Sequence, residues 1–428
     1  MISEETRKSY LFLIKWVLIA LSGGISAAFG VRSFSYLLQE FSKLVVSWNL
    51  PRYILPVIGG IIVGNIFYMA EPEASGEGIP SYIRAVNYKY GFLSPTATLF
   101  KYLAALFTLS FLGSGGIVGP MSRVSAGIMS FIAGLLGRFG LSKEEHRTFA
   151  ICGVGGAIGA ILHTPIGGGI FAVEILKREN MSYKDLFPAI LASSFSFIIN
   201  KSLGYPAFYS IKAPAHFMDI RYLGWLLLVS LLAGFVGIFF ITIYERISMF
   251  FRRLNRLNLS TIIGASICGL LSLVSVDILG TGSDLIASVS RGEYHMLHRS
   301  ELFGEHLFLL FLSLILLKIL ATSFTIGSGL SAGFTGPTIF LGIFTSLIIS
   351  DLTGVKPGSP TFCAFMAAGI SGMFASVMNV PIAGAVIVTE MFGLNYSFPA
   401  AWGSIIAFQI ARHKTIYTYA TSAVYPSR

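Results

Sequence analysis

The sequence has few charged residues. Of its 428 residues, 12% are Asp, Glu, Lys or Arg and 54% are hydrophobic, and the mean hydropathy is +0.76. In a soluble globular domain about a quarter of the residues are charged, so this composition excludes an ordinary soluble protein. It indicates a chain that lies largely in a membrane.

Cysteine is scarce as well. The three cysteines, Cys152, Cys268 and Cys363, lie in apolar segments and lack metal-ligand spacing, so we expect small buried side chains without disulfides. The chain also has no His-Glu-x-x-His motif, no cluster of metal ligands, and no serine, histidine and aspartate set typical of a hydrolase. We therefore expect no enzyme, no metal and no organic cofactor.

Long uncharged runs are abundant. They cover Tyr53–Ala70, Tyr102–Ser122, Tyr222–Tyr244, Ile319–Ser350, Ala364–Thr389 and Met391–Ala411. Each is close to or longer than the roughly 18–20 residues that cross a bilayer as a helix. The sequence therefore predicts an all-α, multi-pass membrane protein, with residues 1–428 forming one membrane domain.

The basic residues suggest an orientation. Arg7, Lys8 and Lys15 favour a cytoplasmic N-terminus. A second basic cluster, Arg246–Arg256, is expected in a cytoplasmic loop that faces anionic lipid rather than nucleic acid. With no organelle signal and no room for a cytosolic domain, we expect the inner membrane of a prokaryotic cell.

The chain contains an internal repeat. GVGGAIGAILHTPIGGGIFAVEIL, from Gly153, aligns with GISGMFASVMNVPIAGAVIVTEMF, from Gly369, so that Glu174 matches Glu390. A shift one residue longer aligns Gly119-Pro120 with Gly336-Pro337. We predict two halves, 10–205 and 220–412, joined by a polar loop around Tyr205–Arg221, and a C-terminal helix over 413–428. Repeated halves with Gly/Pro-interrupted apolar segments are typical of transporters.

The interruptions ending in Gly-Pro predict anion sites. Gly113–Pro120 holds several glycines and a proline ahead of an apolar helix, and none of these residues is charged. Proline suits the first helical turn, and the glycines leave backbone amides free to point at a ligand. Those amides carry the positive end of the helix dipole. A site of partial charges binds an anion without holding it too tightly for transit.

Three such breaks and a late tyrosine resemble the CLC family of chloride channels and chloride/proton antiporters. GEGIP at Gly76–Pro80 is similar to the family's GSGIP, and GFTGP at Gly333–Pro337 is similar to GxFxP. GIVGP at Gly116–Pro120 stands where the family has G(K/R)EGP, and TIY at Thr415–Tyr417 resembles the segment with the anion-binding tyrosine. The order and spacing fit over nearly the whole chain.

The resemblance implies that each subunit has about 18 broken, tilted helices, arranged in two inverted halves. It also implies a homodimer in the bilayer with a separate anion pathway in each subunit and a seam near 165–203 and 381–412. Bound chloride ions are the expected ligands, and the anion-binding positions that it implies are Gly76, Glu77, Gly78, Ile79, Ile117, Val118, Gly119, Phe334, Thr335 and Tyr417. An alternative for Tyr417 is a place in the aromatic belt at the membrane interface.

The chain departs from the family at both proton stations. Val118 stands in place of the gating glutamate of the second break, and Ile175 stands in place of the internal proton-transfer glutamate. Glu174 matches the preceding acid, and its repeat mate Glu390 favours a structural role at a helix end. Neither aliphatic residue titrates, so we expect passive, channel-like transport of chloride or a similar small anion.

Glu77 complicates this expectation, because it replaces the serine that contacts the central anion. A carboxylate in a membrane pathway is costly unless it is paired, neutralised or hydrated. Three interpretations stay open: a protonated Glu77 that donates a hydrogen bond to the anion, a relocated gate or proton carrier, and a side chain turned away into water. The second would make the protein a proton-coupled anion exchanger.

Selectivity is the third open question. Thr335 stands where the family has phenylalanine, which suggests a wider pore or a different anion contact, and Glu77 alters the central position. The alternatives to chloride are therefore nitrate, fluoride and bicarbonate. Arg123, one helical turn inside the second break, could pair with Glu77, with Glu174 or with neither.

Overall fold

The computed structural model describes residues 4–137, 140–177, 181–215, 217–298 and 307–417. Within these ranges the regular secondary structure is helical, and one isolated antiparallel bridge joins Gly116 to Gly333. The all-helical fold predicted from the sequence is confirmed. The helices fall into two sets, on either side of a non-helical linker that follows α9.

The first set comprises nine labelled α-helices with two short helical turns between them. These elements are α1 (Glu4–Ser47), α2 (Leu55–Ile62), η1 (Val63–Phe67), α3 (Tyr68–Ala70), η2 (Pro72–Ala74), α4 (Ile79–Tyr88), α5 (Pro95–Ser110), α6 (Val118–Leu136), α7 (Lys143–Leu162), α8 (Gly167–Glu174) and α9 (Tyr183–Ser202). Local sequence fixes several starts. The Ser94 hydroxyl, for example, accepts a hydrogen bond from the Ala97 amide at 3.2 Å, just before Pro95 opens α5.

The second set follows the linker. These elements are η4 (Ile220–Tyr222), α10 (Leu223–Leu254), α11 (Leu257–Leu271), η5 (Val276–Ile278), α12 (Ser283–Ser290), η6 (Tyr294–Met296), α14 (Leu307–Gly327), α15 (Thr335–Thr353), α16 (Pro360–Met373), η7 (Phe374–Met378), α17 (Pro381–Phe392), η8 (Leu394–Tyr396) and α18 (Ser397–Ala411). Three members of the expected loop cluster, Arg246, Arg252 and Arg253, lie instead on α10, because this helix continues to Leu254. The prediction of a loop there was wrong.

Six helical stretches of the described chain are long and apolar enough to span a bilayer. They are Leu13–Ser47, Val118–Leu136, Ile220–Leu254, Leu307–Gly327, Thr335–Thr353 and Pro360–Met378. The first was not among the uncharged runs, because Lys15, Arg32 and other charged residues interrupt it. The other five each overlap a run found in the sequence but begin or end at other residues, and the multi-pass architecture is confirmed.

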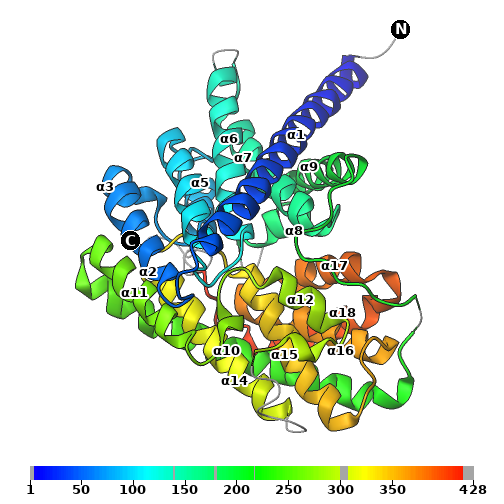
Figure 1. The fold of residues 1–428 in the computed structure, drawn as a ribbon. Helices are drawn as coiled ribbons and strands as arrows, with labels where there is room; N and C mark the ends of the chain where they lie inside the picture. The colour runs from blue at the N-terminus through cyan, green and yellow to red at the C-terminus, as the bar shows by residue number, and fades with distance from the viewer. Residues whose placement is uncertain (1–3, 138–139, 178–180, 216, 299–306, 418–428) are drawn as a thin grey trace.

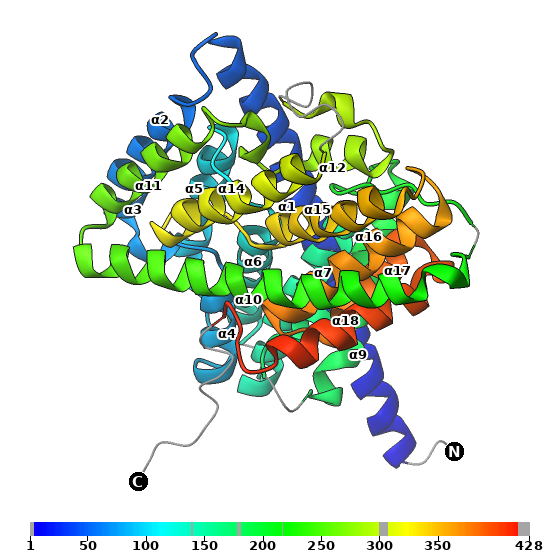
Figure 2. The ribbon, with the colours of Figure 1, turned by 90° about the horizontal axis from the view of Figure 1, so that it is seen from below.

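The two sets are arranged as inverted halves. In Figure 1, α1, α5, α6, α7 and α9 lie above α10, α14, α15, α16 and α18. The repeat-equivalent glycines Gly116 and Gly333 exchange backbone hydrogen bonds, each amide donating to the other carbonyl at 2.7 Å. A reciprocal antiparallel pair between equivalent residues is what a local two-fold axis produces. Figure 2 shows α10 crossing the second half beside α14 and α18.

Reciprocal capping joins the halves a second time. The Glu174 carboxylate, at the end of α8, accepts hydrogen bonds from the Ile382 and Ala383 amides at 3.0 and 2.6 Å. Its repeat mate Glu390, on α17, accepts from the Ile166 and Gly167 amides, both at 2.9 Å. Each half thus caps the positive helix end of the other.

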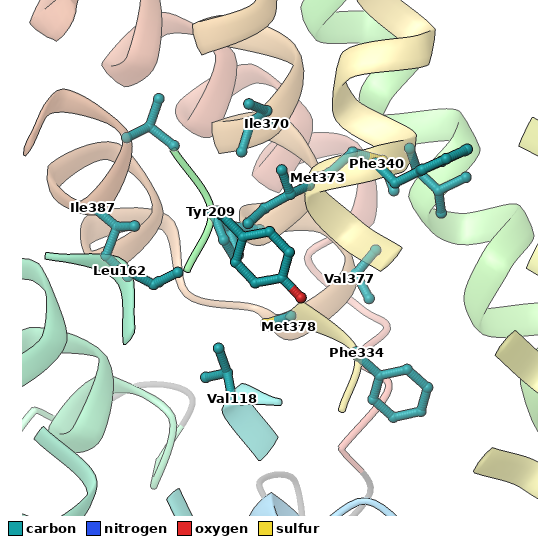
Figure 3. Packing of buried hydrophobic residues seen from close by; sticks show 14 of the residues in the cluster. Val118, Leu162, Tyr209, Phe334, Phe340, Ile370, Met373, Val377, Met378 and Ile387 are labelled. Atoms are coloured by element: carbon teal, nitrogen blue, oxygen red, sulfur yellow. The ribbon is translucent and has the colours of Figure 1, made fainter. Parts of the chain in front are cut away.

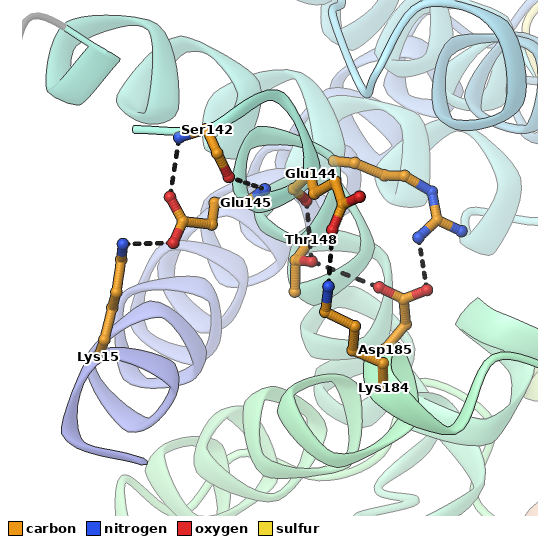
Figure 4. Close-up of polar contacts among 8 residues, drawn as sticks. Lys15, Ser142, Glu144, Glu145, Thr148, Lys184 and Asp185 are labelled. Atoms are coloured by element: carbon orange, nitrogen blue, oxygen red, sulfur yellow. Dashed lines mark hydrogen bonds and ion pairs between the residues drawn. The ribbon is translucent and has the colours of Figure 1, made fainter. Parts of the chain in front are cut away.

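The N-terminal end of α7 is fixed by polar contacts with its neighbours (Figure 4). Ser142 and Glu145 form a capping box, and Lys15 of α1 pairs with the same glutamate. Asp185 of α9, nearly buried, is paired with Arg147 at 2.5 Å and accepts a hydrogen bond from Thr148 at 3.3 Å. These contacts hold α1, α7 and α9 together at one end of the first half.

The apolar core lies where the two halves meet (Figure 3). Val118 of α6, Leu162 of α7, Phe340 of α15 and Met373 of α16 belong to one continuous cluster of buried side chains. The linker residue Tyr209 lies among them, with 1% of its surface exposed. The core therefore surrounds the two breaks that begin α6 and α15.

Candidate anion-binding site

Three chain breaks converge in the middle of the structure. They carry the first residues of α4, α6 and α15, and the Gly116–Gly333 bridge fastens two of them side by side. The third approaches through Gly78, whose φ of 124° suits glycine. A Cβ on Gly78 would collide with the carbonyl of Gly119, so only glycine allows this contact. Three helix N-termini thus point at one small region.

The Glu77 carboxylate lies in that region, with 4% of the residue exposed. Its Oε2 accepts a hydrogen bond from the Ile79 amide at 2.6 Å, and its Oε1 accepts one from the Tyr417 hydroxyl at 3.2 Å. The Phe334 amide also interacts with the carboxylate. A Cβ on Gly119 would strike Oε1. Each converging helix therefore brings backbone against this group, and Glu77 does not turn away into water.

Lys101 compensates the buried charge. This lysine of α5, 2% exposed, donates to the carbonyls of Gly76 and of Ala74, the latter at 3.1 Å. Its ammonium also attracts the Glu77 carboxylate. A buried carboxylate needs such a partner, because the apolar interior disfavours an isolated charge. Lys101 was not among the residues predicted for the site. A signal for it is present in the repeat, because the alignment that matches Gly119 with Gly336 also matches Lys101 with Lys318.

Lys318 shows that the second half has an equivalent break. Its ammonium, fully buried, donates to the carbonyls of Ile278 and Gly280 at 2.9 and 3.3 Å. Gly280 and Gly282 have positive φ and precede α12, as Gly76 and Gly78 precede α4. Thr281 takes the place of Glu77. This fourth break has no proline, so it does not show the Gly-Pro pattern that marks the other three.

Tyr417 reaches the site on a non-helical segment. α18 ends at Ala411, and the Ile416 amide donates to the Val377 carbonyl at 2.9 Å, which draws the chain off the helical path. The helix expected from residue 413 is therefore wrong for 413–417, and 418–428 lie outside the described residues. The tyrosine is fully buried, and its ring centroid lies 6.0 Å from that of Phe334. That burial does not fit an interface-belt position.

The two aliphatic substitutions lie in different surroundings. Val118 is the first residue of α6 and is 1% exposed, next to the converging breaks. Ile175 is the C-cap residue of α8 and is 2% exposed in the apolar core. The next residue, Leu176, accepts a hydrogen bond from the Asn87 side chain at 2.9 Å. Ile117 and Thr335, also buried, flank the breaks. The structure thus brings together all of the expected anion-binding positions and leaves Ile175 apart.

Two cavities approach this region. The larger, which we call the wide cavity, measures about 900 Å³; it is lined in part by the cations Arg32, Lys43 and Arg52, by the acids Asp277 and Asp284, and by the Gly280–Ser283 break. The smaller, the narrow cavity, measures about 410 Å³ and is lined by Ser81, Arg84, Lys89 and Arg123, with Glu73 as its acid. Cationic walls raise the local concentration of anions.

Arg123 belongs to the narrow cavity. Its Nη1 donates to the Thr98 hydroxyl at 2.8 Å, and the described residues show no hydrogen bond from it to Glu77 or Glu174. Among the described residues, no three His, Cys, Asp or Glu side chains are grouped to hold a metal ion. Around Glu77 the structure brings together backbone amides, the Tyr417 phenol and the Lys101 ammonium.

Comparison with known proteins identifies the family. The voltage gated chloride channel family matches residues 59–412. The chain belongs to this family. It is 28% identical over 424 residues to an uncharacterized protein of Methanocaldococcus jannaschii, covering 96% of each chain. It is 25% identical over 439 residues to the voltage-gated ClC-type chloride channel ClcB of Salmonella typhimurium, covering 95% of this chain and 98% of that one.

Solved structures share the fold. A CLC-type fluoride/proton antiporter aligns with a TM-score of 0.80 at 23% identity, covering 96% of this chain and 99% of that one. A slow cyanobacterial Cl⁻/H⁺ antiporter aligns with a TM-score of 0.76 at 19% identity, covering 95% and 96%. The inverted-repeat fold and a role in anion transport across a membrane follow from membership of this family.

Proposed function

We propose that this protein carries chloride or a similar small anion through the point where α4, α6 and α15 meet. The observation that supports this is the convergence of the Ile79 and Phe334 amides and the Tyr417 hydroxyl on one buried group. These donors suit an anion, and as partial charges they hold it weakly enough for release. Bound anions are then the only ligands that transport requires, and no cofactor takes part.

The Glu77 carboxylate occupies the place of the transported anion. It accepts the hydrogen bonds that an anion would accept. The space beside Gly119 is too small even for a Cβ, so the carboxylate and an anion cannot lie there together. Two negative charges so close would also repel each other strongly in an apolar interior. Transport therefore requires the carboxylate to leave this position or to be neutralised, which makes Glu77 a gate.

We propose passive, channel-like transport as the mode. Val118 and Ile175 stand at the two positions where the resembled antiporters carry their proton-transferring glutamates, and neither side chain titrates. Glu174, the acid next to Ile175, is engaged in capping α17. A proton reaching Glu77 would open the gate without being transferred across the membrane in step with the anion.

Proton-coupled exchange is a second candidate, and the position of Glu77 favours it. A proton-coupled exchanger needs a carboxylate and an anion that compete for one site. The carboxylate leaves the site when it binds a proton, so one proton is bound each time that the site becomes free for an anion. Two structures with the same fold are described as proton antiporters, one for fluoride and one for chloride. The transported anion is accordingly one of chloride, fluoride, nitrate and bicarbonate.

Efflux from liposomes tests both modes. The purified protein is reconstituted with chloride inside, valinomycin clamps the potential, and a chloride electrode and a pH electrode record together. Chloride efflux without proton movement supports the passive mode. Protons driven uphill by the chloride gradient contradict that mode and establish exchange. Absence of flux for chloride, fluoride, nitrate and bicarbonate alike would contradict the proposed function itself.

We further propose a homodimer in the inner membrane of the cell. Apolar side chains on the four helices at the expected seam are about half exposed in the single chain: Ile166 on the approach to α8, Ile198 on α9, Ile382 on α17 and Ile405 on α18. The site and both cavities are built from one chain, so each subunit would carry its own pathway.

A further inference from the structure

Tyr209 is a buried tyrosine whose hydroxyl has no hydrogen-bond partner. It lies in the linker between the halves, 1% exposed, and its hydroxyl oxygen is fully enclosed by protein. Leaving a buried donor unpaired costs stability, so such groups usually have a functional explanation. The hydroxyl of Tyr417, in contrast, is bonded to Glu77.

The Tyr209 hydroxyl lies against the two fastened breaks. A Cβ built on Gly116 would be 3.1 Å from the hydroxyl oxygen, and one built on Gly336 would collide with it. Figure 3 shows the hydroxyl directed toward the chain segments that carry Val118 and Phe334. The phenol therefore points at the N-terminal ends of α6 and α15, whose amides and dipoles favour an anion.

The surroundings of this hydroxyl resemble those of the Glu77 carboxylate. Gly119 and Gly336 are repeat equivalents. A Cβ on Gly119 would strike the Glu77 carboxylate, and a Cβ on Gly336 would strike the Tyr209 hydroxyl. The two polar groups thus lie against equivalent glycines of the two halves, although Thr281 takes the sequence place of Glu77. One place is filled by a carboxylate with partners, and the other contains a lone donor.

Tyr209 also lies on the side of the wide cavity. Its chain neighbours Phe208 and Ser210 line that cavity, and the Phe208 amide is tied to the Ile161 carbonyl at 2.8 Å. The Gly115 amide donates to the Gly280 carbonyl, which belongs to the cavity wall, at 3.2 Å. The Tyr209 phenol therefore lies between residues of the cavity wall and the two fastened breaks.

We propose that Tyr209 is an anion ligand, which donates its hydroxyl to the anion between the wide cavity and the Glu77 position. The inference rests on the proposed function and adds to it a residue that determines affinity and selectivity. A neutral phenol at this place, beside Val118, binds a halide or small oxyanion by donation alone. Unlike a carboxylate, it neither competes with the anion nor carries a proton across.

The test uses the full-length chain in liposomes, with Tyr209→Phe compared with the wild type. Initial efflux rates are measured over a range of chloride, fluoride and nitrate concentrations. Loss of one neutral hydrogen bond to the anion should raise the half-saturating concentration of the transported anion about fivefold. Because the removed hydroxyl has no partner in the protein, thermal stability should stay equal or rise.

Tyr396→Phe is the matched control. The Tyr396 hydroxyl donates to the Pro214 carbonyl in the linker at 2.8 Å. This variant therefore removes a tyrosine hydroxyl that holds the linker but does not belong to the breaks. It should lower stability and leave the half-saturating concentration unchanged. If Tyr209→Phe does not assemble, Gly336→Ala replaces it, since the added methyl displaces the hydroxyl and should weaken anion binding likewise.

The outcomes separate this inference from the proposed function. Wild-type flux together with an unchanged half-saturating concentration in Tyr209→Phe would overturn the role of Tyr209 and leave anion transport intact. A loss of stability in Tyr209→Phe without a change in affinity would assign the hydroxyl to folding and overturn the inference as well. Absence of flux in the wild type would instead count against the proposed function.

Discussion

At the scale of single residues, Glu77 is the buried acid that accepts hydrogen bonds from Ile79 and Tyr417. The GEGIP motif placed a carboxylate where the resembled family has a serine, and three interpretations remained. Hydrogen bonds from Ile79 and Tyr417 exclude the one in which Glu77 faces water. Lys101 and Tyr209 were not assigned from the sequence, because the motif residues that they approach are distant from them in the chain.

Gly119→Ala tests how closely the helix ends and Glu77 approach one another. Its methyl would fill the space that the carboxylate, or the anion in its place, now occupies. We expect anion flux to fall about tenfold, since overpacking of this kind costs about 1–3 kcal/mol and about 1.4 kcal/mol corresponds to a factor of ten. Liposome efflux measures the loss.

Gly134→Ala is the control for that substitution. Gly134 lies on the same helix, α6, and a Cβ there would meet no atom within 4 Å. Alanine in an exposed helix position should preserve flux and raise stability slightly. Equal flux in the two alanine variants would contradict the close approach of Gly119 to Glu77.

At the scale of helices, broken segments are stabilised by groups from the other half. Glu174 and Glu390 cap each other's helices, α17 and α8, across the junction. The sequence repeat aligned the two acids and favoured a structural role, and the hydrogen bonds agree with that interpretation. It could not show that the caps are exchanged between halves, because an alignment contains no distances.

Removing either cap should cost stability without affecting transport. Glu174→Ala and Glu390→Ala each leave two helix-terminal amides without their acceptor, and we expect a loss of about 1–2 kcal/mol in either variant. Thermal unfolding in detergent checks the two against the wild type. A change of proton or anion flux in Glu174→Ala alone, with unchanged stability, would instead assign Glu174 to the pathway.

At the scale of the whole molecule, the overall pattern of the sequence predicted an architecture that no single motif contains. The uncharged runs and the repeat gave an all-helical membrane protein of two halves, and the family match over 59–412 agrees. The long α1 was not predicted, because charged residues interrupt its apolar face. The break before α12 was not predicted either, because Gly280–Ser283 has no proline to mark it.

The proposed dimer is a whole-molecule prediction. Exchange of Ile198 and Ile405 for tryptophan should crowd a seam built from α9 and α18 and yield monomers in detergent, as measured by light scattering. Leu99→Trp, on the exposed face of α5, is the control and should remain dimeric. Flux per chain should persist in the monomer. A dimer that survives the double change would place the seam elsewhere.

The central claim is that the Glu77 carboxylate occupies the position of the transported anion. The most direct test is the pH dependence of anion efflux for the wild type and for Glu77→Gln, which keeps the shape and removes the charge. The account predicts that wild-type efflux rises on acidification, and that the variant conducts at least severalfold faster at neutral pH with little pH dependence. Equal rates and equal pH profiles for the two proteins would contradict it.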